Sequence, residues 1–238
     1  MLVGSSTLLL GEAGTGKTLA GASFLVTGAQ AGEPGLYVGF FESPARLISK
    51  VDGVGLTLGR QVANGTIALM WQPPLEASID ALAGALLTAV RERGVRRLFI
   101  DGLEGFARVS VEPERIEAFF TALSNELRAL DVTTVVSLEQ TRLFDPTVEA
   151  PIRGVSATFE NLLLLRTVEL RAQLHRLVSI IKMRESAYDA AIHEFCISDQ
   201  GIDVAATFAS ADTVLTDLER PGPAPTTGAP SPETGRGR

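Results

Sequence analysis

A glycine-rich segment of eight residues near the N-terminus has the residue types that phosphate binding requires. It reads Gly11-Glu12-Ala13-Gly14-Thr15-Gly16-Lys17-Thr18, and it follows an apolar run and opens a helix-like segment, as a phosphate-binding loop does. Glycines let the backbone wrap a phosphate closely enough for several N–H groups to donate at once. We predict that Lys17 contacts the β- and γ-phosphates of a nucleotide and that the Thr18 hydroxyl binds Mg²⁺.

An aspartate at the end of a second apolar run is the other candidate for metal binding. Asp101 closes the segment Arg97-Leu-Phe-Ile-Asp101, which has the pattern of a buried strand. The carboxyl ends of parallel strands meet at one edge of a sheet, so we expect Asp101 beside Thr18, where it would hold Mg²⁺ through the water shell of the ion.

Hydrolysis of a nucleotide would also need a carboxylate that activates water in line with the γ-phosphate. Glu42, directly after a predicted strand, is our first candidate for this base, and Glu104 and Glu139 are the alternatives. The sequence contains no N-K-x-D or T-K-x-D motif for guanine, no L-S-G-G-Q motif of transporter ATPases and no arginine-rich lid of small kinases. We therefore predict that the nucleotide is ATP.

These residues need a scaffold, and the chain alternates strand-length apolar runs with amphipathic, helix-length segments. The predicted strands are 6–10, 36–41, 66–71, 97–101 and 133–138, and the clearest helix is 112–130. Three further predicted strands, over 161–170, 174–184 and 192–204 with a turn near residue 200, follow each other through short turns. The pattern predicts an α/β fold with a mostly parallel central sheet, helices on both faces and antiparallel C-terminal hairpins.

The composition limits the class of protein. With 45% hydrophobic and 21% charged residues in 238, the chain fits one large folded domain, expected over residues 1–215. Residues 216–238 form a Pro/Gly-rich tail, which we expect to be disordered because it has too few large apolar side chains to pack. The net charge of −7 argues against a nucleic-acid partner.

The lack of a recognisable targeting signal and the cysteine usage lead us to expect a cytoplasmic protein. No apolar stretch reaches the roughly 20 residues of a membrane span, and the N-terminus lacks the pattern of a signal peptide. Cys196, the single cysteine, excludes an internal disulfide and a multi-cysteine zinc site. Because Phe195 and Ile197 flank it, we expect Cys196 to be buried.

The order of these motifs resembles the KaiC domain of circadian clock ATPases, within the RecA superfamily. The segments that carry the resemblance lie between residues 3 and about 208 and read GSSTLLLGEAGTGKT, FFESP, RRLFID, TTVVSLEQ and, most strongly, KMRESAYDAAIHEFCISDQGID at 182–203. The resemblance implies a RecA-like P-loop NTPase fold, with ATP and Mg²⁺ as cofactors. It also implies a homo-oligomer, expected as a hexameric ring with ATP between neighbours. Lys182 and Arg184 match the K-x-R pair that reaches the γ-phosphate of the next subunit, and Gln140 matches a polar residue that senses this phosphate.

The sequence departs from the family pattern at three places. Phe41 stands where the family has the first of two glutamates, so we expect slow or residual hydrolysis. Ser156-Ala157 stands where clock KaiC has a pair of phosphoacceptors, which argues against autophosphorylation. Clock KaiC proteins have two such domains and a segment before the first strand, so we expect an upstream start or a fragment here.

Three functions stay open on this evidence. The leading one is a slow, Mg²⁺-dependent ATPase that acts in signalling or regulation with a protein partner the sequence does not name. The second is a nucleotide-binding scaffold whose catalysis has decayed, which Phe41 favours. The third is a recombinase relative on DNA, which the neutral charge balance of residues 141–155 disfavours.

Overall fold

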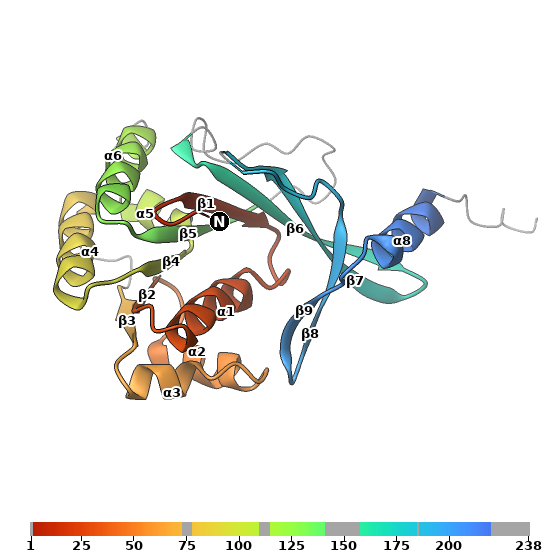
Figure 1. The fold of residues 1–238 in the computed structure, drawn as a ribbon, viewed down its shortest axis with the longest axis horizontal. Helices are drawn as coiled ribbons and strands as arrows, with labels where there is room; N and C mark the ends of the chain where they lie inside the picture. Colours follow the sequence, from red (N-terminus) through yellow and green to blue (C-terminus); the bar gives the residue numbers. More distant parts are fainter. Residues whose placement is uncertain (1, 73–77, 110–114, 141–157, 185, 220–238) are drawn as a thin grey trace, which may run out of the picture.

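The structure is a computed structural model that describes residues 2–72, 78–109, 115–140, 158–184 and 186–219 (Figure 1). Its strands are β1 (Ser6–Gly11), β2 (Gly35–Gly39), β3 (Ile67–Trp71), β4 (Arg97–Asp101), β5 (Thr133–Glu139), β6 (Asn161–Leu170), β7 (Gln173–Lys182), β8 (His193–Ser198) and β9 (Gly201–Val204). Its helices are α1 (Lys17–Gln30), α2 (Pro44–Asp52), α3 (Leu58–Ala63), α4 (Ile79–Arg93), α5 (Leu103–Val109), α6 (Arg115–Ala129) and α8 (Ala209–Glu219).

The strands of the described residues form one nine-stranded sheet in the order β3-β2-β4-β5-β1-β6-β7-β8-β9. Neighbours from β3 to β6 are parallel, and β6 to β9 are antiparallel. The structure therefore confirms the α/β fold with a mostly parallel sheet and antiparallel C-terminal hairpins. Parallel order brings the carboxyl ends of β1, β2, β4 and β5 to one edge of the sheet, where the phosphate loop, Asp101 and Glu42 lie.

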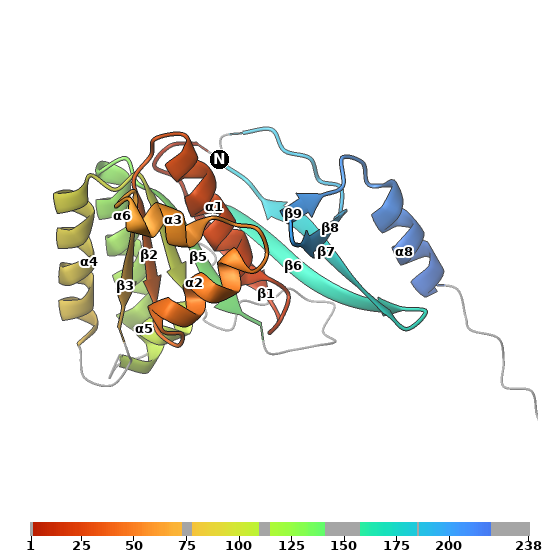
Figure 2. The same ribbon diagram turned by 90° about the horizontal axis from the view of Figure 1, so that it is seen from below.

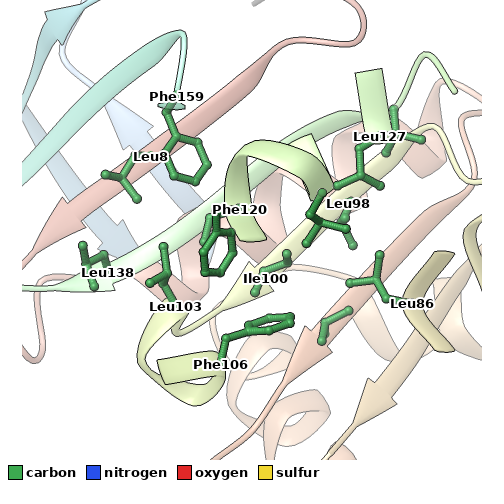
Figure 3. Close-up of a cluster of buried hydrophobic side chains, with 14 of the residues drawn as sticks. Leu8, Leu86, Leu98, Ile100, Leu103, Phe106, Phe120, Leu127, Leu138 and Phe159 are labelled. Atoms are coloured by element: carbon green, nitrogen blue, oxygen red, sulfur yellow. The ribbon is translucent and has the colours of Figure 1, made fainter. Parts of the chain in front are cut away.

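Helices cover both faces of the parallel part of the sheet (Figures 1 and 2). Side chains alternate along each strand, so Leu8 and Leu10 of β1 pack with α4, α5 and α6, whereas Leu9 packs with α1, α2 and α3. Figure 3 shows the first of these two cores, in which Phe106 of α5 and Phe120 of α6 meet edge to face with their ring centroids 5.3 Å apart. Burial on both faces explains why these strands are apolar throughout.

Helix α1 lies very close to β4 because a glycine faces the sheet. A Cβ built at Gly21 would lie 2.1 Å from Cζ of Phe99, a side chain with no exposed surface. This contact fixes the start of α1, and with it the phosphate loop, relative to the strand that ends at Asp101.

The C-terminal strands form tight hairpins. Arg171 and Ala172, both with positive φ, make a two-residue turn between β6 and β7; the sequence predicted a turn here over residues 171–173, but Gln173 already belongs to β7. Strand β7 ends at Lys182, so the prediction that the strand continues to residue 184 is wrong. The pairing of β7 with β6 shifts register near Leu162, directly beside that end.

Two further expectations differ from the structure. Cys196 is exposed, because its neighbours Phe195 and Ile197 point to the opposite face of β8 and pack against the α1 side of the sheet. The boundary predicted at residue 215 lies inside α8, where Ala211 and Val214 are buried one helical turn apart. Residues 220–238, the rest of the predicted tail, lie outside the described residues. No helix in the described ranges has the length and apolar content to cross a bilayer.

Candidate nucleotide site

The predicted phosphate loop connects the end of β1 to the start of α1. Gly14 and Gly16 have φ values of 79° and 104°, which only glycine adopts at little cost. Gly16 is the N-cap of α1, so the first N–H groups of that helix point toward the loop. A Cβ at Gly16 would also lie 2.9 Å from Cδ1 of Ile197, because β8 packs against this loop. The loop has the backbone shape and the helix terminus that bind anions.

The ammonium of Lys17 lies inside the loop. Its Nζ donates to the carbonyl oxygens of Gly11 and Glu12, each at 2.7 Å. Burial lowers the pKa of Lys17, while nearby carboxylates, Glu139 foremost, act in the opposite direction. A phosphate would therefore meet a lysine that is held in place and surrounded by acidic side chains.

Asp101 and Thr18 meet at the edge of the sheet, as the sequence predicted. Thr18 Oγ1 donates to Asp101 Oδ2 at 2.9 Å, and Ser137 Oγ donates to Oδ1 at 2.9 Å. A hydroxyl and a carboxylate are the oxygen ligands that Mg²⁺ prefers, and Mg²⁺ takes few ligands from protein when phosphate supplies the others. The residues present therefore fit a Mg²⁺ ion bound together with a nucleotide.

A cavity of about 570 Å³ opens beside the phosphate loop and contains most of the predicted site. Its lining includes Lys17, Thr18, Asp101 and all three candidates for the base, which are Glu42, Glu104 and Glu139. The structure thus brings together residues from the ends of four parallel strands.

The Glu42 carboxylate forms an ion pair with Lys50 of α2, and both side chains line the cavity. Glu42 follows β2 through a short loop, and α2 begins two residues later with Pro44. The pair is partly exposed, with 42% of the Lys50 side chain and 30% of the Glu42 side chain accessible. Phe41 also lines the cavity and is 54% exposed.

Glu104 is a partly buried carboxylate of the cavity. Burial raises the pKa of its carboxyl group, and the backbone N–H groups of Glu104 and Glu139 partly oppose this shift by donating to it. An acid whose pKa is raised toward neutrality can accept and return a proton, which keeps Glu104 among the candidates for the base.

The lining also includes residues that were not predicted from the sequence, among them Tyr37, Ser137, Arg176 and Ile197. Arg176 is the most consequential, because its buried Nε has no hydrogen-bond partner among the residues that the structure describes, and the side chain borders the phosphate loop. Arg176 lies in β7, opposite Phe195 of β8, so only the fold of the hairpins brings it to the loop.

Lys182 and Arg184 lie away from the phosphate loop of their own chain. Lys182 pairs with Leu162 near the start of β6, whereas the loop lies at the level of Leu165. Its Nζ donates to the carbonyl of Phe159 at 2.7 Å, and burial and then the charge of Arg184 lower its pKa.

Gln140 follows β5, and its backbone N–H donates to the Gly11 carbonyl at 3.0 Å. Gln140 is not among the described residues that line the cavity. Ser156 and Ala157 both lie outside the described residues.

A phosphate loop between a central parallel strand and a helix, with an aspartate at the edge of the same sheet, defines a P-loop NTPase domain of the RecA-like class. The sequence profile described as "ATPase: KaiC" matches residues 1–208. The chain therefore belongs to the KaiC ATPase family.

Curated relatives agree with this assignment. The circadian clock oscillator protein KaiC of Thermostichus vulcanus is 26% identical over 211 residues, which is 89% of this chain and 40% of that protein. KaiC of Nostoc sp. is 28% identical over 213 residues, covering 85% of this chain and 40% of the relative. The circadian clock protein KaiC3 of Synechocystis sp. is 26% identical over 218 residues, covering 89% and 41%. The chain thus spans about two fifths of the length of these relatives.

Proposed function

We propose that this chain binds ATP with Mg²⁺ in the cavity beside the phosphate loop and hydrolyses it slowly, in the service of signalling or regulation. The observation that carries the proposal is the contact between Thr18 and Asp101 beside the ammonium of Lys17, in a cavity that also holds Glu42. Membership of the KaiC ATPase family supports ATP as the nucleotide.

Different residues of the site have different roles in the proposed hydrolysis. Lys17 and the first N–H groups of α1 neutralise the β- and γ-phosphates. Thr18 and Asp101 hold Mg²⁺, which when bound polarises the phosphate oxygens. Glu42 accepts a proton from the attacking water, the water oxygen bonds to the γ-phosphorus, and ADP leaves. Glu42 must separate from Lys50 to do so, and this ion pair is one reason to expect slow turnover.

Arg176 supplies a second positive charge at the loop. Its Nε is buried beside the cavity and has no acceptor within the described ranges, and a buried donor without an acceptor is costly. A phosphate oxygen of the bound nucleotide would satisfy this donor, and the charge-assisted bond would add affinity.

We also propose that the active form is a homo-oligomeric ring. Lys182 ends β7 opposite Leu162, at the end of β1 away from the loop, and Arg184 follows it, so we infer that a site receives the pair from a neighbouring copy. Placing the two halves of a site on different subunits makes hydrolysis depend on assembly, as arginine fingers do.

A mixing experiment tests this arrangement. Lys17→Ala removes the phosphate-binding half of a site, and Lys182→Ala removes the half contributed to the neighbour. Each variant alone should be inactive, whereas a mixture should regain part of the wild-type turnover because some interfaces combine two intact halves. Activity of Lys182→Ala alone at the wild-type rate would overturn the arrangement.

A catalytically decayed scaffold is the second candidate, and Phe41 is the observation that favours it. Its ring lies at the cavity, close to Gly102 after the metal-binding strand, where an acidic side chain could otherwise act on water. This candidate predicts tight ATP binding without release of phosphate, which a direct phosphate assay distinguishes from slow hydrolysis.

A further inference from the structure

A buried tyrosine contacts the candidate metal-binding aspartate. Tyr37 lies in the middle of β2 and is 3% exposed, and its hydroxyl donates to Asp101 Oδ2 at 2.6 Å. The same carboxylate oxygen accepts the hydrogen bond from Thr18. Thr18 is itself a predicted metal ligand, whereas Tyr37 belongs to no motif of the phosphate loop.

Tyr37 reaches Asp101 because a glycine leaves room along the strand. In the pairing of β2 with β4, Tyr37 lies opposite Phe99 and Gly39 lies opposite Asp101. Gly39 lies two residues after Tyr37 and therefore on the same face of the sheet, so the tyrosine side chain extends past it toward Asp101. A Cβ at Gly39 would lie 2.6 Å from Tyr37 Cε1 and 3.3 Å from its hydroxyl oxygen. Any other residue at position 39 would displace the ring.

The ring is also held from the β4 side. Tyr37 and Phe99 meet nearly edge to face, with centroids 5.6 Å apart and an interplanar angle of 63°. Phe99 is fixed in turn by its close contact with Gly21 of α1. The hydroxyl therefore has little freedom to leave the aspartate.

The tyrosine remains a donor. Its hydroxyl donates to the same carboxylate oxygen that accepts from Thr18. With Ser137 donating to Oδ1, hydroxyl groups from three elements fix both oxygens of the Asp101 carboxylate.

We propose that Tyr37, with the space left by Gly39, is a positioning residue of the Mg²⁺ site: it orients Asp101 so that the carboxylate meets the water shell of the ion. The proposal rests on the proposed function, because it concerns the Mg²⁺ bound with ATP. Groups that orient metal-binding carboxylates in this way contribute about 10- to 100-fold to metal affinity.

Tyr37→Phe tests the proposal, because it removes the hydroxyl and keeps the ring that packs on Phe99. Binding of a non-hydrolysable ATP analogue is measured by calorimetry at increasing Mg²⁺ and, separately, in EDTA. We expect the Mg²⁺ concentration at half-maximal binding to rise about tenfold, with binding in EDTA unchanged. Tyr188→Phe, the same change at an exposed tyrosine, is the matched control and should give the wild-type titration.

The outcomes separate this proposal from the proposed function. If wild type shows Mg²⁺-stimulated binding and the Tyr37→Phe titration overlays it, the positioning role is wrong and the ATP site stands. If wild type shows no Mg²⁺-dependent binding, the proposed function fails and the positioning role fails with it. Gly39→Ala should also raise the Mg²⁺ requirement if the folded protein is recovered, because the added Cβ displaces the tyrosine ring.

Discussion

Thr18 Oγ1 lies 2.9 Å from Asp101 Oδ2, although 83 positions of the chain separate the two residues. The contact forms because β5 pairs with both β1 and β4 and brings their carboxyl ends to one edge of the sheet. It unites the two sequence motifs that predict nucleotide binding, and the predictions below follow from it and from the residues around it.

Removing either group that holds Mg²⁺, directly or through its water shell, should abolish Mg²⁺-dependent turnover. We expect Asp101→Asn and Thr18→Ala each to lower ATP hydrolysis by at least about 100-fold, because each loses a group that holds the ion. Thr18→Ser keeps the hydroxyl and should retain most of the activity. A phosphate-release assay at saturating ATP measures the effect, and wild-type rates for Thr18→Ala would contradict the assignment.

Arg176→Gln should weaken ATP binding by about 10- to 100-fold, the effect expected from the loss of one hydrogen bond between charged groups. Thermal stability should change little, because the Nε of Arg176 has no partner within the described chain. Arg93→Gln, the same substitution at an exposed position on α4, is the control. Equal affinities of the two variants, measured by calorimetry, would show that Arg176 does not contact the nucleotide.

Glu104 should make the nucleotide-free protein less stable as the pH rises. Its pKa is raised by burial, so the folded state binds the proton more tightly than the unfolded state does. Stability is therefore lost as the pH increases from the ordinary value of 4.5 through the raised folded value. Glu104→Gln removes this titration, so the variant should gain in melting temperature relative to wild type over that interval. Thermal melts from pH 4.5 to about pH 8 measure the difference, and a gain that shrinks with pH would contradict it.

Two glycine-to-alanine substitutions should have opposite effects. Gly21→Ala places a Cβ 2.1 Å from Phe99 in the core and should cost about 1–3 kcal/mol of unfolding free energy. Gly84→Ala, on α4, meets no atom within 4 Å and should gain about 0.5–1 kcal/mol through higher helix propensity. Denaturant melts measure both, and a stable Gly21→Ala variant would mean that α1 does not approach β4 this closely.

The sequence was sufficient to place the phosphate loop and Asp101 at strand ends and to predict a mostly parallel sheet, because these depend on local pattern and spacing. It was insufficient for Tyr37 and Arg176, which reach the cavity only through strand register and the fold of the hairpins. Glycines carry part of the missing information. The role of Gly39 becomes visible only once the path of the Tyr37 ring is known.

The expectation for Cys196 failed for a related reason. Successive side chains on a strand point to opposite faces, so apolar residues on either side of Cys196 indicate that their face is buried and that the face of Cys196 is not. In β8 the buried face is the one with Phe195 and Ile197. The prediction that β7 extends to residue 184 was wrong because the strand ends near a shift of register with β6. Local strand propensity does not indicate such a shift.

The most direct test of the central claim is ATP turnover by wild type, Glu42→Gln and Lys182→Ala, with the molecular mass in solution recorded in the same nucleotide. We expect slow phosphate release by an oligomeric wild type and loss of turnover in both variants, with ATP binding retained by Glu42→Gln. If wild type assembles and binds Mg²⁺·ATP but no phosphate appears from any of the three proteins, the chain is a nucleotide-binding scaffold and the claim of hydrolysis is wrong.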